Sequence, residues 1–313
     1  MIKIKAFAKI NLFLDVLNKR PDGYHNIRSL LTAVSLSDDI SIASRPKEIS
    51  TSITPACRFP GVPWDFSMGA NDKNLITRAA RLLKKHTGCR KGAAISLTKR
   101  IPIGAGLGGG SADAAAVLTG LNRLWKTGLS REQLREISAQ IGCDVPALIH
   151  GGAMRMEGRG EIITPIAQAA ENGLWLLLVY PGFAISTTDI YRRLDRRRRT
   201  SPRPPKAAID RKFRLVLSGL EKGCQEDIGQ GLFNAFQEAV FEKFPILEMI
   251  KNNLEKLGCK HVVLTGSGST LFVPVKNRKE GLEAAGRLGR RFGSPLWTRV
   301  VHTIGMTKSD ATI

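Results

Sequence analysis

The stretch PIGAGLGGGSADAAAVLTGLNRLW, residues 102–125, holds five glycines within seven residues and continues directly into an alanine-rich helix. Glycine lets the backbone approach a ligand closely, and a helix N-terminus carries a partial positive charge. Together these features favour phosphate binding. A purely structural glycine turn is the alternative, although so many glycines destabilise a fold unless something uses them.

Two well-known phosphate motifs do not explain this loop. Gly104, Gly106 and Gly109 match the GxGxxG pattern, but a dinucleotide fold needs a second parallel strand after the helix, ending in an acidic residue about 20 residues on. Here a second helix follows instead, opened by a capping box of Ser130 and Gln133. The Walker pattern fails because no Lys-Ser or Lys-Thr pair follows the glycines. We therefore predict a phosphate loop of another architecture.

Around the loop, the pattern predicts an α+β protein. Residues 2–13 have a period of two, typical of a strand, with Lys9 and Asn11 on the same face. After a turn at 20–25, an extended run reaches residue 34. Further strands are expected over 40–43, 93–99, 153–156, 174–180, 262–264, 271–275 and 296–302, helices over 74–86, 109–126, 130–141, 231–241, 246–257 and 281–291, and a loop over 45–70.

The composition is that of a globular protein large enough for two domains: 313 residues, of which 42% are hydrophobic and 24% charged. The longest apolar stretch, residues 174–180, is far shorter than the ~20 residues that cross a bilayer, so we expect no membrane partner. Lysines interrupt the N-terminus, which argues against a signal peptide. Five cysteines without a CxxC pair support neither a disulfide framework nor a zinc site and favour a reducing cytoplasm.

The net charge of +21 is unevenly spread. Residues 192–214 hold eleven basic residues against two aspartates and so carry +9 of it. One hypothesis is a nucleic-acid-binding module. The four arginines at 196–199 and the SPRPP that follows them at 201–205 have no interleaved aromatic residues and no known nucleic-acid motif, which argues against that partner. We favour a solvated surface loop, because blocks of like charge with proline repel one another and stay disordered.

Two side chains outside the glycine loop are candidates for catalysis. Asp144 follows a helix stop and precedes Val145-Pro146, so it is either the N-cap of a helix or a general base near the phosphate loop. Lysine on a strand is usually solvated. Lys9, however, faces alongside Asn11 on a strand of otherwise apolar residues, which makes a functional role more plausible.

Several blocks of sequence together resemble a known superfamily. They are AKINLFLDV (8–16) with RPDGYH (20–25), PIGAGLGGGSADAA (102–115), GCDVPALIHGG (142–152) and LTGSGSTLF (264–272). In this order they resemble the galactokinase, homoserine kinase, mevalonate kinase and phosphomevalonate kinase (GHMP kinase) superfamily. RPDGYH is similar to that of the 4-diphosphocytidyl-2-C-methyl-D-erythritol kinases within it. A homoserine or mevalonate type of kinase is the nearest alternative, but those acceptors have no base to bind.

The resemblance implies a two-domain α+β GHMP kinase fold. An N-terminal β-rich α+β domain, expected over 1–180, would bind ATP, and a ferredoxin-like α+β domain, expected over 181–313, would bind substrate and carry the basic loop 192–214. ATP and a small-molecule alcohol would meet in the cleft between the domains. Because the first block begins at Ala8, we also expect no transit peptide and a cytoplasmic location. The assembly is expected to be a monomer or homodimer.

The resemblance also implies an ATP site. Asn74 and Lys99 would lie near the adenine, and Mg²⁺, with ligands that the sequence leaves unknown, would neutralise the triphosphate. The residues expected to wrap the ATP phosphates are Pro102, Gly104, Gly106, Leu107, Gly108, Gly109, Gly110, Ser111 and Ala112.

For the acceptor, the resemblance implies that Asp144 takes the proton from the hydroxyl on carbon 2 of the erythritol unit. Lys9 would hold Asp144 ionised, and Asn11 would orient the acceptor. Tyr24 and His25 would bind the cytosine by stacking and hydrogen bonding, with a pair that merely packs the turn as the alternative. The remaining residues expected at the substrate are Asp15, Pro181, Gly182, Thr187, Gly266, Ser267 and Gly268.

Three features depart from the family pattern. Asp113 adds a negative charge near the phosphates and either points into the fold or helps to hold a metal. Leu31 replaces an aromatic residue that some relatives carry near the base. The basic run 192–214 is not part of the pattern at all.

Overall fold

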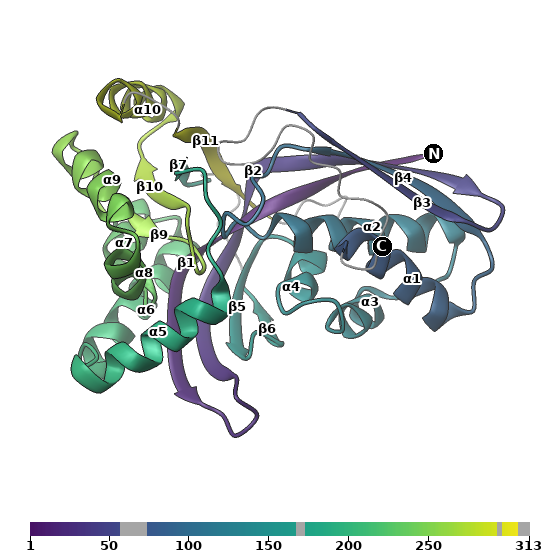
Figure 1. The fold of residues 1–313 in the computed structure, drawn as a ribbon, viewed down its shortest axis with the longest axis horizontal. Helices are drawn as coiled ribbons and strands as arrows, with labels where there is room; N and C mark the ends of the chain where they lie inside the picture. Colours follow the sequence, from purple (N-terminus) through teal and green to yellow (C-terminus); the bar gives the residue numbers. More distant parts are fainter. Residues whose placement is uncertain (57–73, 167–172, 293–295, 306–313) are drawn as a thin grey trace.

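The computed structural model of the chain describes residues 1–56, 74–166, 173–292 and 296–305 (Figure 1). Two long strands, β1 (Ile2–Lys19) and β2 (His25–Arg45), run antiparallel on either side of the RPDGYH turn. The strand predicted at 40–43 is the end of β2, because Ile40 and Ile42 continue its buried face without a break. The hairpin places Lys9 and Asn11 in the middle of the sheet.

β2 is the centre of the N-terminal part of the sheet. It pairs antiparallel with β4 and β5, while β3 adds to β4 in parallel and β6 adds to β5. The bounds are β3 (Ile49–Pro55), β4 (Gly92–Lys99), β5 (Ala153–Gly158) and β6 (Ile162–Pro165). The loop predicted over 45–70 is therefore wrong for residues 49–55, whose alternating side chains make an edge strand; residues 57–70 lie outside the described ranges.

β11 joins this part of the sheet to a second group of strands. Its last two residues, Thr303 and Ile304, pair with β2, and the residues before them pair with β7. β7 pairs in turn with β10, which pairs with β9. The bounds are β7 (Trp175–Tyr180), β9 (Val263–Leu264), β10 (Leu271–Val275) and β11 (Trp297–Ile304), each close to its predicted range. The domain division at residue 180 stays a prediction, and β7 hydrogen-bonds to strands from the C-terminal part of the chain.

Four helices lie together on one side of the β1–β4 sheet (Figure 1). They are α1 (Leu75–Thr87), α2 (Gly109–Trp125), α3 (Arg131–Ser138) and α4 (Val145–His150). The alanine-rich face of α2 packs against apolar residues of β1, β2 and β4, forming one continuous core. The predicted capping box of Ser130 and Gln133 is confirmed at the start of α3.

The second group of strands is covered by helices of the C-terminal part of the chain. They are α5 (Thr187–Thr200), α6 (Lys206–Lys222), α7 (Gln225–Gly231), α8 (Gln237–Lys243), α9 (Pro245–Lys256) and α10 (Arg278–Phe292). The helix predicted over 231–241 is wrong in its first half. There a two-residue strand, β8 (Phe233–Asn234), pairs with Phe13 and Leu14 of β1. None of the helices in the described ranges is long and apolar enough to span a membrane.

The basic run 192–214 is not the disordered loop that its charge predicts. It forms the second half of α5, a short turn and the first half of α6. Ile190 and Leu194 bury one face of α5, and Ile209 and Phe213 bury one face of α6. Apolar side chains four residues apart give each helix one buried face, and the packing of that face outweighs the repulsion between like charges. Carboxylates and carbonyl groups from distant parts of the chain partly neutralise those charges.

Candidate active site

The glycine loop leaves β4 and runs into α2. Gly104, Gly106 and Gly108 have positive φ angles of 68°, 80° and 68°, a conformation that residues with side chains rarely adopt. A Cβ at Gly106 would lie 2.7 Å from the carbonyl oxygen of Thr265, and one at Gly108 would lie 2.8 Å from Cγ of Lys9. Both the backbone conformation and the packing therefore require these glycines.

A cavity of about 290 Å³ opens beside this loop. Most of the residues expected to contact ATP line it: Asn74, Lys99, Pro102, Gly104, Gly106, Leu107, Gly108, Gly109, Gly110 and Ser111. Ala112 does not, because it lies on the buried face of α2, in the core. Oδ1 of Asn74 caps α1 by accepting from the backbone N–H of Ile76 at 3.0 Å. Its Nδ2 is buried and has no protein partner within the described ranges, so it is an available donor.

Lys99 and Asp113 form a sealed ion network at the base of this cavity. The Lys99 Nζ donates at 2.6 Å both to Asp38 Oδ2 and to Asp113 Oδ2. Burial raises the pKa of Asp113 to about 7, although Lys99 acts in the opposite direction. Burial acts to lower the pKa of Lys99, but the two carboxylates outweigh it and raise that pKa. Asp113 thus points into the fold, one of the two alternatives that the sequence left open.

A second glycine turn, residues 265–270, leans against the first. The backbone N–H of Thr270 donates to the carbonyl of Ala105 at 3.2 Å. A Cβ at Gly266 would lie 3.1 Å from the carbonyl oxygen of Gly106. Asn234 holds the turn from behind, because its Nδ2 donates to the carbonyl of Gly266 at 2.8 Å. The two turns therefore form one rigid junction.

Lys9, Asn11 and Asp144 meet at this junction. The Lys9 Nζ donates to Asn11 Oδ1 at 2.7 Å and lies 3.4 Å from Asp144 Oδ2. Lys9 is buried, whereas the side chain of Asp144 is 33% exposed. Asp144 stands at the N-cap position of α4 but makes no side-chain cap hydrogen bond. Its carboxylate is therefore open to a ligand rather than used to cap the helix.

A larger cleft of about 790 Å³ lies on the other side of the glycine loop, and Gly104, Gly106 and Gly108 line both spaces. It brings together most of the residues expected at the acceptor: Lys9, Asn11, Tyr24, His25, Asp144, Thr187, Gly266, Ser267 and Gly268. The hydroxyls of Thr187 and Ser267 are 2.8 Å apart and join α5 to the second turn. The cleft therefore connects a phosphate loop with residues from both halves of the chain.

Some expected residues do not line this cleft. A register irregularity between Asn11 and Phe13 shifts the alternation of β1, so Leu14 faces the cleft while Asp15 is buried against Arg203. Pro181 and Gly182 follow β7 and lie outside the lining. Leu31, the departure from the family pattern, is fully buried beneath β5 and does not line the cleft.

The far end of the cleft is aromatic. The ring of His25 stacks on Tyr191 with centroids 4.9 Å apart, and its Nε2 lies 2.7 Å from Asp195 Oδ1. Burial alone would raise the pKa of Asp195, but hydrogen bonds from Lys19 and His25 outweigh it and lower that pKa. Burial also raises the pKa of Tyr191 to about 12, so its hydroxyl stays protonated.

Tyr24 is on the open side of this end. It is 56% exposed, and the Arg159 guanidinium lies 5.2 Å from the centre of its ring. Sequence reasoning missed several lining residues, namely Lys19, Asp22, Cys143, Met156, Arg159, Ile185, Thr188, Tyr191, Arg192, Asp195 and Phe236. The sequence does hold a signal for two of them. Ser186 is a typical helix N-cap, and on the helix that it begins, Tyr191 and Asp195 are four residues apart and so share a face.

Comparisons with known proteins agree with this geometry. Residues 74–152 match the GHMP kinases N terminal domain and residues 216–294 match the GHMP kinases C terminal domain. The 4-diphosphocytidyl-2-C-methyl-D-erythritol kinase of Geobacillus thermodenitrificans (strain NG80-2) is 40% identical over 271 residues, 87% of each chain. The chain belongs to this kinase family.

Two further matches extend the family relation over nearly the whole chain. The kinase of the same name from Thermodesulfovibrio yellowstonii (strain ATCC 51303 / DSM 11347 / YP87) is 36% identical over 305 residues, covering 97% of this chain and 98% of that one. A crystal structure of 4-(cytidine 5'-diphospho)-2C-methyl-D-erythritol kinase superposes with a TM-score of 0.75 at 28% identity, covering 96% of this chain and 99% of the other. The two-domain GHMP kinase fold is therefore confirmed.

Proposed function

We propose that this chain transfers the γ-phosphoryl group of ATP to the 2-hydroxyl of 4-diphosphocytidyl-2-C-methyl-D-erythritol. The layout of the cleft carries this proposal. At one end the Lys9–Asp144 pair lies against the glycine loop, and at the other end the rings of His25 and Tyr191 form an aromatic wall. An alcohol acceptor that ends in a cytosine needs both ends. The name shared by the relatives supports the same acceptor.

At the reacting end, we assign the proton of the acceptor hydroxyl to Asp144. Its carboxylate is partly exposed and free of a capping bond, so it has room to approach a hydroxyl. The Lys9 ammonium beside it favours the ionised carboxylate and places a positive charge where the transferring phosphoryl group needs it. Asn11, held by Lys9 and by the hydroxyl of Ser29, is positioned to orient the acceptor.

At the far end, we assign cytosine to Tyr24 and His25. Tyr24 presents an exposed ring face for stacking. Asp195 fixes the orientation of the His25 ring through its Nε2, and Tyr191 supports that ring from one side. The cationic side chains of Arg159 and Arg192 also line the cleft and suit the diphosphate of the acceptor.

The residues of the smaller cavity fit a nucleotide triphosphate, because its glycines leave no room for side chains and present backbone N–H groups. Mg²⁺, when bound, neutralises charge on the triphosphate. Within the described ranges there is no group of three acidic, histidine or cysteine side chains that could hold a metal. Asp113, the acid that lines this cavity, already pairs with Lys99. We therefore expect the phosphates and the Ser111 hydroxyl to supply the metal ligands.

A homoserine or mevalonate type of kinase is less well supported. A homoserine kinase structure is 18% identical to this chain and a mevalonate kinase structure is 16% identical, and identities this low show only a shared fold. Their acceptors carry no base and would leave the His25 and Tyr191 end of the cleft empty. A cytoplasmic location and a monomeric or homodimeric state stay predictions.

The test is ATP-dependent phosphorylation by the purified chain with three competing acceptors: 4-diphosphocytidyl-2-C-methyl-D-erythritol, homoserine and mevalonate. We expect phosphorylation of the cytidyl acceptor alone. Asp144→Asn should abolish most of this activity, while Asp227→Asn on α7, outside both cavities, should retain it. An inert cytidyl acceptor would show that the proposed substrate is wrong.

A further inference from the structure

The hairpin of β1 and β2 extends past the rest of the sheet at the end that carries Tyr24 and His25 (Figure 1). β8 pairs with β1 no further than Leu14, and β5 pairs with β2 no further than Ile27. Among the described strands, residues 15–26 therefore have no ladder partner besides the two strands of the hairpin itself. A two-stranded ribbon is only marginally stable alone, so this end of the hairpin needs support from another element.

A bulge in β1 weakens the hairpin just before its turn. Val16 pairs with Ile27 and Lys19 pairs with His25, so two residues of β1 stand opposite a single residue of β2. Such a bulge disrupts the ladder of hydrogen bonds and bends the strand. The direction in which the turn projects, and with it the position of Tyr24 and His25 in the acceptor cleft, therefore depends on what holds the bulge.

Arg198 of α5 contacts the backbone of β1 at this bulge. Its Nη1 donates to the carbonyl of Leu17 at 2.9 Å, and its Nη2 donates to the carbonyl of Val16. A guanidinium suits two neighbouring carbonyls because its N–H groups form a rigid planar fork, which the ammonium of a lysine lacks. The two hydrogen bonds therefore fix the backbone of β1 where its own ladder is disrupted.

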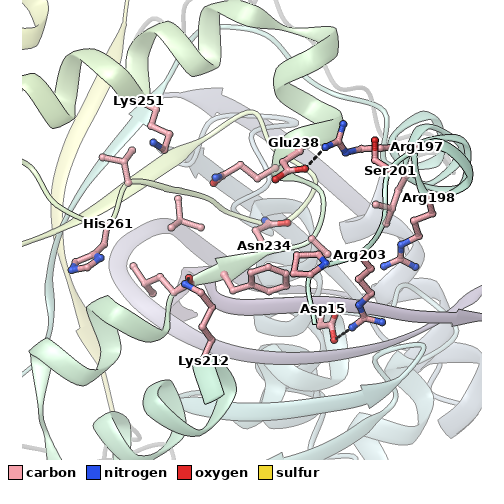
Figure 2. Close-up of a pocket in the computed structure, with 18 of the residues that line it drawn as sticks. Asp15, Arg197, Arg198, Ser201, Arg203, Lys212, Asn234, Glu238, Lys251 and His261 are labelled. Atoms are coloured by element: carbon pink, nitrogen blue, oxygen red, sulfur yellow. Dashed lines mark hydrogen bonds and ion pairs between the residues drawn. The ribbon is translucent and has the colours of Figure 1, made fainter. Parts of the chain in front are cut away.

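The same helix also contacts the hairpin beyond the bulge. Asp195, three residues before Arg198 and so on the same face of α5, accepts from Lys19 at 3.0 Å and lies 2.7 Å from Nε2 of His25. α5 is in turn fixed to α8, because Arg197 pairs with Glu238 (Figure 2). A firmly packed helix therefore contacts the hairpin both before and after the bulge.

We propose that Arg198 is a positioning residue for the acceptor: it holds the bulge of β1 against α5, so that Tyr24 and His25 face the cleft. This role rests on the proposed function, which places cytosine at those two residues. Arg198 is not among the residues that line the acceptor cleft, so it acts through the hairpin. The proposal also gives the basic run an internal purpose, since Arg203 likewise contacts β1, at Asp15 (Figure 2).

The test is the steady-state kinetics of the full chain, with ATP and 4-diphosphocytidyl-2-C-methyl-D-erythritol varied in turn. Arg198→Lys keeps the positive charge and removes the fork. It should raise the KM for the cytidyl acceptor about tenfold and leave kcat and the KM for ATP within about twofold of the wild type. Arg199→Lys, the same change at the exposed neighbouring residue of α5, is the matched control and should leave all three values unchanged.

Backbone hydrogen exchange gives a second readout that needs no substrate. In Arg198→Lys, the amides of residues 16–27 should exchange faster than in the wild type, while those of α2 should not. Faster exchange along the whole chain would show a general structural role and overturn the proposal, as would an unchanged KM for the acceptor. A wild type that leaves the cytidyl acceptor unphosphorylated would contradict the proposed function instead, and unchanged exchange in the hairpin would then overturn the role of Arg198 as well.

Discussion

Two buried lysines flank the glycine loop, and they are paired in different ways. Lys99 is held by two carboxylates at 2.6 Å, all three side chains being almost inaccessible. Lys9 faces a single carboxylate, Asp144, at 3.4 Å, and that carboxylate is one-third exposed. The sealed network fixes the loop, whereas the loose pair has room for a substrate between its members. Similar residue types thus serve structure in one place and chemistry in the other.

The largest effect should follow from removing the open carboxylate. Asp144→Asn is expected to lower kcat by roughly 10²- to 10⁴-fold, because the general base is lost while its volume is kept. The KM for ATP and the melting temperature should change little, since Asp144 makes no cap bond. Steady-state kinetics and thermal unfolding measure both. A large loss of stability in this variant would show that the Lys9–Asp144 pair, like the Lys99 network, holds the fold together.

Removing the sealed lysine should act on stability instead. Lys99→Met leaves Asp38 and Asp113 buried without their cation and should cost about 3–5 kcal/mol in the free energy of unfolding. Urea denaturation gives this value, with Lys91→Met, an exposed residue just before β4, as a control. A fully stable Lys99→Met variant with normal activity would show that the network does not fix the loop.

The pH dependence of stability should separate the two regions further. The pKa of Asp113 is raised to about 7 in the folded state from 3.8, so the folded protein binds a proton more tightly than the unfolded chain. Its contribution to stability is full below pH 3.8 and is lost as the pH rises towards 7. The stability of the wild type relative to Asp113→Asn should therefore fall between pH 5 and pH 7 and then level off. Urea denaturation across this range measures it, and a constant difference would contradict the raised pKa.

A smaller effect is expected at the aromatic end of the cleft. Asp195→Asn weakens the hold on His25 and should raise the KM for the cytidyl acceptor about tenfold, while the KM for ATP stays unchanged. Asp210→Asn, which changes an ion pair of Arg28 outside the cleft, is the control. A change in kcat alone would place Asp195 in the reacting end of the cleft instead.

The sequence predicts the local parts of this site and misses the distant ones. The glycine loop, the period-two face of Lys9 and Asn11, and the motif around Asp144 are each local patterns, and their assembly follows from the family resemblance. The pairing of His25 with Asp195 spans 170 residues and leaves no local signal. For the same reason charge counting failed over 192–214, where Arg203 finds its partner in Asp15 at the other end of the chain. The register of β1 shifts between Asn11 and Phe13, before Asp15. Beyond such a shift, the period of two no longer predicts which face of the sheet a side chain is on.

Lys9 and Asp144 are expected to act together at the acceptor hydroxyl. The most direct measurement is the single-turnover rate of phosphoryl transfer from ATP to the cytidyl acceptor in the wild type, Lys9→Met, Asp144→Asn and the double variant. Groups that act as a unit have effects that do not multiply, so the double variant should be about as slow as the slower single variant. Losses that multiply, or an Asp144→Asn variant that keeps the wild-type rate, would contradict the claim.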